Sequence, residues 1–278
     1  MITSDWGEWL PNAVEAADPE TVDIWYLGCN GFVLKAAEGT TLWIDPYVGV
    51  GDPPRTVRMI PIPFDPTDVG AEAVDAVLAT HEHTDHTHGP SQGPLLETGA
   101  AFYAPDDSLA VALEDEQWLE QYDITDSQFT DVTEGDSLEI GAFEIDVVET
   151  YDPDSTHPVG YVIKHDSGTV FHAGDSKPAD SFSEIGERYD IDIGILAFGA
   201  VGNILDKETR EPVRTKWYAT ENETIYSASE LQLERLLPSH WDMWKGMTAD
   251  PKVLQHHARS YEYPQRLEIV EIGDRIEL

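Results

Sequence analysis

Apolar and polar positions alternate along the chain in a way that predicts many short strands with helices between them. Runs of apolar and β-branched residues are separated by glycines and acidic turn residues. The predicted strands are Asp23–Leu27, Gly31–Ala36, Thr41–Ile44, Val74–Ala79, Ser137–Ile140, Phe143–Glu149, Val159–Lys164, Thr169–His172, Ile191–Phe198, a run into His240 and two short terminal strands. Val74–Ala79 and Ile191–Phe198 are apolar enough to be buried strands.

Helices are predicted where the apolar positions recur at a helical period. Asp106–Tyr122 has an amphipathic pattern, and further helices are expected near 179–189, 222–236 and 250–261. Strands followed by a helix, twice over, indicate an α/β (α+β) fold in which two mixed β-sheets pack together with helices outside, in four αββα layers. No linker-like composition separates the halves, so we expect a single domain over residues 1–278.

Two long segments lack either period. Residues 46–69 contain six prolines and two glycines, which predicts a long surface loop. Residues 201–220 are polar and irregular. The opening segment, with Trp6 and Trp9, is expected to form a short helix or arm that docks its aromatic side chains.

Composition narrows the class of protein. The chain is 41% hydrophobic, as soluble globular proteins are, and it has no apolar stretch long enough to span a bilayer. Residues 1–20 carry five acidic side chains and neither a basic nor an apolar signal segment, so we expect a cytoplasmic protein. The single cysteine, Cys29, lies in a strand-like run and is interpreted as a small buried residue rather than a catalytic thiol.

The acidic charge limits the partners. Asp and Glu number 54 against 16 Lys and Arg, a formal net charge of −38. Nucleic-acid binding relies on basic surface, so we expect neither nucleic acid nor a membrane as partner, but a small anionic substrate. We interpret the charge as adaptation to a cell of high internal salt. The sequence is compatible with a homo-oligomer and does not decide the oligomeric state.

Three histidines and an aspartate fall within six residues, directly after the predicted buried strand Val74–Ala79. The segment is His81-Glu82-His83-Thr84-Asp85-His86. Imidazole and carboxylate groups are the ligands that borderline-hard divalent metals use. In a bend after a strand, His81 and His83 can point to one ion while Asp85 and His86 diverge toward a second. A solvated polar loop would have no reason to follow a buried strand, so the pattern predicts a metal site.

The pattern His-x-His-x-Asp-His is the signature of the metallo-β-lactamase superfamily, which this sequence resembles beyond that motif. Members also carry an Ile/Val-Asp-Pro turn, a later histidine, a Gly-Asp after a strand and a final histidine. The corresponding residues here are Ile44-Asp45-Pro46, His157, Gly174-Asp175 and His240.

Within the superfamily the chain looks closest to the L-ascorbate-6-phosphate lactonase (UlaG-type) branch. The stretches that carry this resemblance are Trp6-Gly7-Glu8-Trp9-Leu10, Trp25-Tyr26-Leu27-Gly28-Cys29, Val74–His81 and His240-Trp241-Asp242-Met243-Trp244. They are scattered over most of the chain, whereas residues 201–220 depart from the branch's pattern.

The resemblance implies a ligand set and its surroundings. One metal would be held by His81, His83 and His157, and the other by Asp85, His86 and His240, with Asp175 bridging the two. Asp45 matches the buried aspartate that supports the motif loop, and His172, on the strand before Asp175, is either a similar support or a satisfied buried histidine. We therefore expect one or two divalent ions, with zinc or manganese favoured and iron also compatible.

The chemistry expected of such a site is hydrolysis. A divalent ion lowers the pKa of bound water to about 7, which gives hydroxide at neutral pH, and polarises the oxygen under attack. Asp85 is the candidate catalytic residue, because a carboxylate within hydrogen-bond reach can orient the hydroxide or move its proton. The leading hypothesis is a metal-dependent hydrolase of a small anionic ester or lactone, resembling the lactonase.

Other functions of this fold stay open. The same motif serves phosphodiesterases, nucleases and phospholipases, although the acidic charge counts against polymers and bilayers. Flavin-linked di-iron redox proteins of the fold carry a glutamate where His83 stands. A non-catalytic metal-binding module is the remaining alternative, because fold does not fix function.

Cations are scarce in this chain, so those in predicted loops are candidates for contact with an anionic substrate. Arg58 lies in the proline-rich loop and Arg214 in the irregular stretch 201–220. A guanidinium fork suits a phosphate or carboxylate. Ordinary surface ion pairs with the abundant acids are the alternative for each. His88, just after the motif, is either a substrate contact or a polar loop residue.

The charge generates a prediction about salt. Repulsion among acidic groups without matching cations should weaken the fold in dilute buffer and relax as salt screens it, over a Debye length of about 10 Å at 0.1 M. We expect the melting temperature to rise steadily from low to molar potassium chloride. A flat or falling melting temperature would show that the charge is not a salt adaptation.

Overall fold

The computed structural model describes residues 3–49, 61–206, 209–243 and 247–278, and the strands among them form two seven-stranded sheets and one two-stranded hairpin. The first sheet contains, in spatial order, β16 (Arg275–Glu277), β1 (Val22–Gly28), β2 (Gly31–Ala36), β3 (Thr41–Ile44), β4 (Ala76–Leu78), β5 (Ala101–Ala104) and β6 (Phe129–Asp131). The second contains β15 (Arg266–Leu267), β14 (Arg235–Ser239), β11 (Ile193–Ala197), β10 (Gly168–His172), β9 (Val159–His165), β8 (Phe143–Glu149) and β7 (Ser137–Ile140).

Each sheet is covered on both faces, which explains its nearly continuous apolar strands. Successive side chains of a strand point to opposite faces. In β1, Ile24 and Tyr26 accordingly join the core between the sheets, whereas Trp25 and Leu27 join the core under the helices that cover the first sheet. The strands thus contribute to two cores at once.

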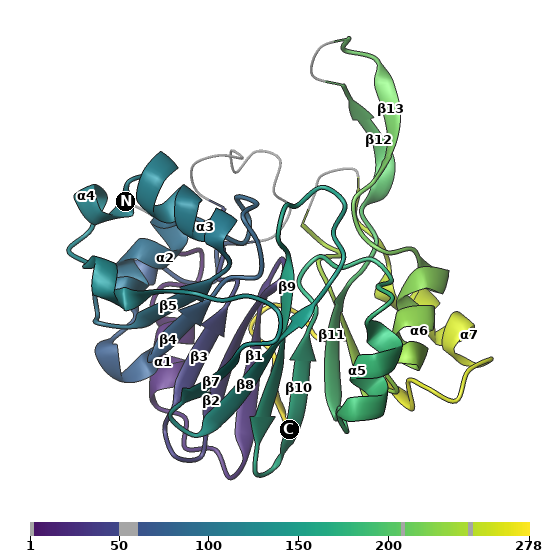
Figure 1. Ribbon diagram of the computed structural model, residues 1–278, viewed down its shortest axis with the longest axis horizontal. Helices are drawn as coiled ribbons and strands as arrows, with labels where there is room; N and C mark the ends of the chain where they lie inside the picture. The colour runs from purple at the N-terminus through teal and green to yellow at the C-terminus, as the bar shows by residue number, and fades with distance from the viewer. Residues whose placement is uncertain (1–2, 50–60, 207–208, 244–246) are drawn as a thin grey trace.

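The helices lie outside the two sheets and complete four layers (Figure 1). The first sheet is covered by α1 (Trp9–Glu15), α2 (Gly89–Leu96), α3 (Asp106–Ala110) and α4 (Trp118–Gln121). The second sheet is covered by α5 (Phe182–Arg188), α6 (Glu221–Glu230) and α7 (Leu254–Ala258). The predicted αββα arrangement of two mixed sheets is confirmed. None of the helices in the described ranges is long and apolar enough to cross a membrane.

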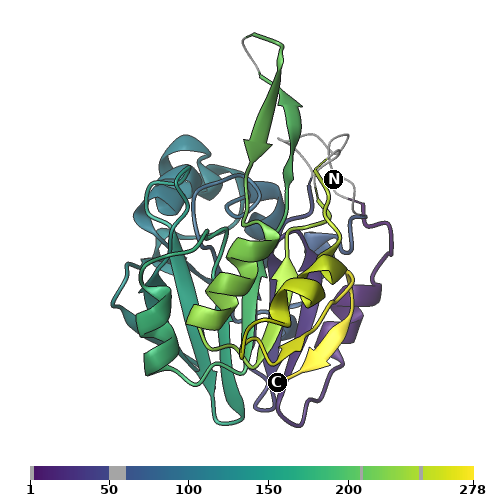
Figure 2. The ribbon, with the colours of Figure 1, turned by 90° about the vertical axis from the view of Figure 1, so that its right-hand side faces the viewer.

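Residues 201–220 are more regular than their composition predicts. They form a hairpin of β12 (Val201–Leu205) and β13 (Pro212–Lys216), paired in antiparallel register from Val201 opposite Lys216. The hairpin projects from the body of the molecule as an arm (Figures 1 and 2). The expectation of an irregular segment was wrong, because strand pairing satisfies backbone groups even where the side chains are mostly exposed.

The helix predicted over Asp106–Tyr122 is also interrupted. After α3 the chain forms one π-helical turn, Val111–Asp115, and Gln117 takes a left-handed conformation with φ 55° before α4 begins. Trp118 is thereby turned fully into the core under the first sheet. Conversely, α2 was missed, because its sequence contains two glycines and two prolines.

The predicted surface loop 46–69 is partly internal. Tyr47, Val48, Ile62 and Phe64 are buried, and Phe64 packs on Trp43 of β3 with ring centroids 5.0 Å apart. Residues 50–60, which include Arg58, lie outside the described residues.

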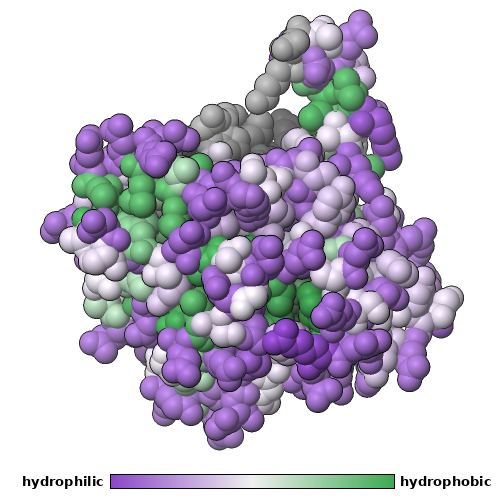
Figure 3. Space-filling model, viewed as in Figure 1, coloured by the Kyte–Doolittle hydropathy of each residue, from purple (hydrophilic) through white to green (hydrophobic). Residues whose placement is uncertain are grey.

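Short single-turn helices connect several of these elements. They are η2 (Pro66–Asp68), η3 (Ala71–Ala73), η5 (Asp126–Gln128) and η6 (Pro251–Val253). Hydrophilic residues cover most of the face seen in Figure 3, as the excess of acidic residues leads one to expect.

The packing of α5 on α6 gives a prediction about stability. Gly186 of α5 is buried, and a β-carbon there would meet the backbone of Glu230 and Leu231 closer than van der Waals contact allows. Gly186→Ala should therefore destabilise the protein by about 1–3 kcal/mol, although alanine is the better helix former. Chemical denaturation measures this, with the exposed Ser183→Ala of the same helix as control. Equal stability of Gly186→Ala and wild type would contradict the described packing.

Candidate metal centre

Loops at the ends of strands from both sheets bring all the predicted ligands but His157 together. The motif loop with His81 follows β4 of the first sheet, whereas Asp175 follows β10 and His240 follows β14 of the second. Nε2 of His81 lies 3.9 Å from Oδ2 of Asp175, and Nε2 of His240 lies 3.1 Å from Oδ2 of Asp85. Residues nearly 160 positions apart in the sequence thus share one site, held by two rigid sheets.

The donors form two adjoining groups. In the first, Asp85, His86, Asp175 and His240 are all buried and offer ligand atoms within 4.8 Å of one another. In the second, His81, His83 and Asp175 do the same. Asp175 belongs to both groups, which is the arrangement expected of a carboxylate that bridges two ions.

Asp45 anchors the motif loop from beneath, as expected from the resemblance. Its carboxylate is fully buried and accepts hydrogen bonds from the backbone N–H of Thr80 at 2.8 Å, the hydroxyl of Thr80 at 2.7 Å and Nδ1 of His86 at 2.8 Å. Because Nδ1 of His86 donates to Asp45, Nε2 is left as the nitrogen that can bind an ion.

The other two histidines of the motif are oriented in the same way. Nδ1 of His81 lies 3.0 Å from the hydroxyl oxygen of Thr80, whose own proton goes to Asp45, so Nδ1 donates and Nε2 faces the site. Nε2 of His83 donates to the carbonyl oxygen of Asp154 at 3.1 Å, which leaves Nδ1 toward His81. Each ring has one nitrogen held by the protein and one turned toward the centre.

The turn between β1 and β2 supports the centre from the opposite side, a role that sequence reasoning missed. Nδ2 of Asn30 donates to Oδ1 of Asp175 at 3.3 Å, and its Oδ1 accepts from the hydroxyl of Ser239 at 2.6 Å. His172, fully buried, donates from Nε2 to the carbonyl oxygen of Asn30 at 3.0 Å. Its Nδ1 accepts from the backbone of Gly174 at 3.2 Å. His172 is therefore both a satisfied buried histidine and a support for this turn.

His157 lies apart from the group to which the resemblance assigned it. Its exposed ring donates from Nδ1 to Oδ1 of Asp106 at 2.7 Å, on the rim formed by α3. Asp152, which sequence reasoning missed, occupies the inner position instead. Its Oδ2 lies 3.6 Å from Nδ1 of His83 and 3.9 Å from Nε2 of His81.

The physical reason lies in the turn before β9. Glu82 accepts hydrogen bonds from the hydroxyl of Ser155 at 2.6 Å and the backbone N–H of Thr156 at 3.0 Å. These contacts tie the turn to the motif loop with Asp152 inward and His157 outward.

The crowding of charged side chains shifts the pKa values of the carboxylates in this centre. Burial alone would raise the pKa of Asp85, but His86 and His240 outweigh it, so the pKa lies well below the ordinary value. The pKa of Asp175 is also lowered. Burial would raise it, but the neighbouring His86 and His240 outweigh that effect. Burial and the neighbouring Asp175 raise the pKa of Asp152.

The pKa values of two histidines, His81 and His86, are shifted in opposite directions. Burial and the neighbouring His86 lower the pKa of His81 well below the usual value. For His86, burial would lower the pKa, but Asp175, Asp45 and Asp85 together raise it well above the ordinary value. The carboxylates of this centre thus favour positive charge among them.

These residues fit divalent ions. Nε2 of His86 is buried without a hydrogen-bond partner, although it lies 3.2 Å from Oδ2 of Asp175. A buried polar atom without a partner costs free energy, and so do several buried carboxylates without a nearby cation. Nitrogen and oxygen donors at this spacing are suited to zinc, manganese or iron, which would offset both costs.

The remaining sequence candidates lie elsewhere or differ in role. His88 is buried at the start of α2, with Nδ1 2.6 Å from the hydroxyl of Ser91. Arg214 is exposed on β13, opposite Asn203 in the hairpin, and outside both donor groups. Its contact with a substrate stays a prediction.

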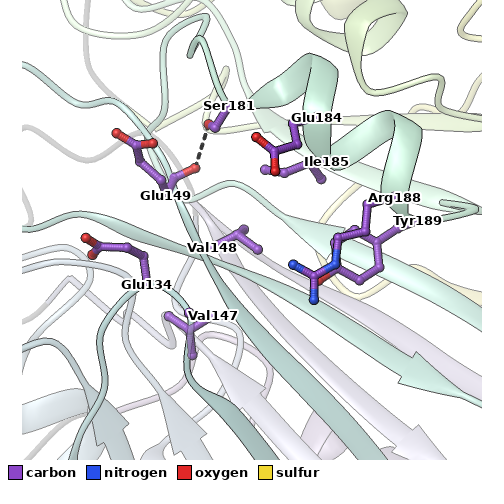
Figure 4. A pocket seen from close by; sticks show the side chains of 10 residues that line it. Glu134, Val147, Val148, Glu149, Ser181, Glu184, Ile185, Arg188 and Tyr189 are labelled. Atoms are coloured by element: carbon purple, nitrogen blue, oxygen red, sulfur yellow. Dashed lines mark hydrogen bonds between the residues drawn. The ribbon is translucent and has the colours of Figure 1, made fainter.

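A pocket elsewhere in the described part of the chain shares no residue with the centre. It lies between β8 and α5, has a volume of about 200 Å³, and is lined by three glutamates together with Arg188 and Tyr189 (Figure 4). The hydroxyl of Ser181 donates across its edge to the carbonyl oxygen of Glu149 at 2.9 Å. Because this pocket contains none of the metal-binding donors, the donor groups at the strand ends remain the candidate functional site.

Comparison with known proteins agrees with this geometry. The sequence profile of the beta-lactamase superfamily domain matches residues 40–241, a range that includes both donor groups. A protein described as probable L-ascorbate-6-phosphate lactonase UlaG, from Escherichia fergusonii, is 24% identical over an alignment that covers 90% of this chain and 78% of that protein.

Solved structures share the fold at lower identity. Igni18, described as a novel metallo hydrolase from Ignicoccus hospitalis, has a TM-score of 0.64 at 19% identity and covers 92% of this chain and 98% of its own. CmlA, a diiron β-hydroxylase from Streptomyces venezuelae, has a TM-score of 0.66 at 15% identity and covers 94% of this chain and 55% of its own. Since a hydrolase and a hydroxylase catalyse different reactions, these likenesses concern the fold alone.

The placement of Asp152 and His157 generates a prediction about metal affinity. Asp152→Ala should lower zinc affinity by at least the roughly 10–100-fold that a lost supporting partner costs, because its carboxylate lies beside His81 and His83. His157→Ala should bind zinc as the wild type does, since its ring lies on the rim. Competition with a chromophoric chelator measures both affinities. The reverse ranking would restore His157 to the ligand set.

Proposed function

The chain belongs to the β-lactamase superfamily, and from this premise we propose that it is a metal-dependent hydrolase of a small anionic ester or lactone. The observation that carries the proposal is the pair of donor groups that share Asp175. Such paired sites suit reactions in which water attacks a carbonyl or phosphoryl centre.

The residues of the centre are assigned to two metal positions. When bound, divalent ions lower the pKa of water to about 7 and polarise the oxygen under attack. We assign to His81, His83, Asp152 and Asp175 the position nearer the surface, and to Asp85, His86, Asp175 and His240 the deeper one. Zinc or manganese is the expected metal, with iron also suited to these donors.

Asp85 is the proposed catalytic residue. Its carboxylate is ionised at neutral pH, because His86 and His240 lower its pKa against the effect of burial. Oδ2 can therefore accept a hydrogen bond from the attacking water and take its proton as the new bond forms. Nε2 of His240, assigned to the same deeper position, lies 3.1 Å from this oxygen.

The substrate is expected to approach at His83. Its side chain is 35% exposed, whereas those of His81, His86 and His240 are 0% exposed. The centre therefore meets solvent on the side of His83, where an ester or lactone group could reach the buried donors.

The position of Lys177 is an argument for an anionic substrate. Its side chain is only 11% exposed and its Nζ lies 3.9 Å from Oδ2 of Asp154, the residue whose carbonyl oxygen accepts from His83. In a chain of 54 acidic and 16 basic residues, a lysine held beside the entrance offers a phosphate or carboxylate a partner. The relation to a probable sugar-phosphate lactonase points to the same substrate class.

The proposal generates a prediction about turnover. Asp85→Asn keeps the size of the side chain but loses its charge, so kcat on the best substrate should fall by about 10²–10⁴-fold. Asp106→Asn, on the exposed rim, should retain wild-type kcat. The assay screens anionic lactones, esters and phosphodiesters with zinc, manganese or iron added, and metal content is measured in each variant.

The possible results separate the hypotheses. Full turnover by Asp85→Asn with its metal retained would refute the role of Asp85. Turnover confined to phosphodiesters would replace the ester or lactone assignment with phosphodiesterase chemistry. If the wild type hydrolysed nothing in the screen, the non-catalytic metal-binding module would be the better description.

A further inference from the structure

The arm formed by β12 and β13 has one face whose side chains are almost all exposed. Residues directly opposite each other in an antiparallel pair lie on the same face of the sheet. One face of the arm is therefore made up of Val201, Asn203, Leu205, Pro212, Arg214 and Lys216. Five of these six residues are exposed, and Val201, the first residue of β12, is half-buried. We refer to this set as the free face of the arm.

The opposite face of the arm rests on the body of the molecule near its base. Gly202 is buried, and Ile204 packs against the buried cluster of Ala197, Ala200, Tyr218 and Met247. Beyond this base the arm leaves the body (Figures 1 and 2), and a strand of five residues spans about 17 Å. A two-stranded hairpin is only marginally stable in water by itself. A partner that packs on the free face would therefore stabilise the arm.

The free face carries cations and no acidic residue, in a chain dominated by acids. Residues 201–216 include four basic and three acidic residues, which leaves 12 basic and 51 acidic residues, a formal net charge of −39, for the rest of the chain. Lys216 is paired with Glu223 of α6 at 2.7 Å, whereas Arg214 forms no ion pair with a described residue. Leu205, which is 51% exposed, adds apolar surface to the same face. The arm is thus complementary in charge to the body of its own kind of chain.

We propose that the free face of the arm docks on the acidic surface of a second copy of this chain. Each chain carries both surfaces, so a two-fold pair makes the same contact twice. This reciprocity matters because specific interfaces take about 20–30 residues from each partner, more than the ten strand residues of one arm supply. The guanidinium of Arg214 suits carboxylates of the partner, and Leu205 supplies apolar contact. The contact involves none of the metal-binding donors, so it does not depend on the proposed function.

Sedimentation velocity of the full chain in molar potassium chloride tests this inference. Salt at 1 M screens the repulsion between two acidic bodies beyond about 3 Å, but it weakens contacts buried in an interface much less. We expect the wild type to sediment as a dimer. Arg214→Glu and Leu205→Asp should each raise the dissociation constant by at least about 10-fold, with circular dichroism as the check on folding. Arg214→Lys keeps the positive charge and should associate more tightly than Arg214→Glu.

Matched controls and contrary results define the test. Arg259→Glu and Leu119→Asp change exposed residues outside the arm in the same way, so they should leave the dissociation constant unchanged. A wild type that stays monomeric at every concentration would overturn the second copy as partner. If that monomer also showed a raised KM for an anionic ester or lactone in Arg214→Glu, Arg214 would belong to the substrate instead. A dimer that survives both arm variants would overturn the role of the arm.

Discussion

The burial of carboxylates in one place is the constraint on which this structure depends. Asp45, Asp85, Asp152 and Asp175 all lie in the interior around the motif histidines. Taking a carboxylate out of water costs several kcal/mol unless opposite charge and hydrogen bonds compensate it. Asp45 is compensated by Thr80 and His86. The others face donor nitrogens and a centre suited to divalent cations.

Two sheets are needed to hold such a centre, because no single turn of the chain supplies enough donors. The first sheet contributes the motif loop and Asp45, and the second contributes Asp175 and His240. The core between the sheets contains residues of both, so their strand ends cannot shift independently. Asn30 and His172 then connect the turn between β1 and β2 to the loop of the second sheet. The resulting rigidity is what ion binding requires, since misplaced donors lose affinity.

The base of the protruding hairpin lies against the centre. Tyr218, just after β13, is buried and stacks on His240 with ring centroids 4.0 Å apart. The arm itself exposes Leu205 and Val213, while its base fixes the orientation of a candidate ligand. Differences in this segment between relatives can therefore change the surroundings of the metals without changing the metal motif. This agrees with the varied reactions of proteins that share the fold.

The sequence by itself determined most of the strands, their layers and the donors of the motif His81–His86, because these depend on period-two patterning and on spacing within one turn. The resemblance to the superfamily singled out Asp45, Asp175 and His240, and the structure places each of them just after the end of a strand. Only the tertiary structure decided between Asp152 and His157. Both belong to one polar turn, and contacts from Glu82, some 70 positions earlier, select which of them points inward.

Cys29 is buried, as expected, and its Sγ lies beside the imidazole ring of His240. This position was likewise decided by tertiary structure, since it depends on a left-handed turn meeting the loop of His240 from the other sheet. Local patterns specify which residues a turn contains. The direction of each side chain depends on partners that are distant in sequence, and these meet only when the two sheets pack.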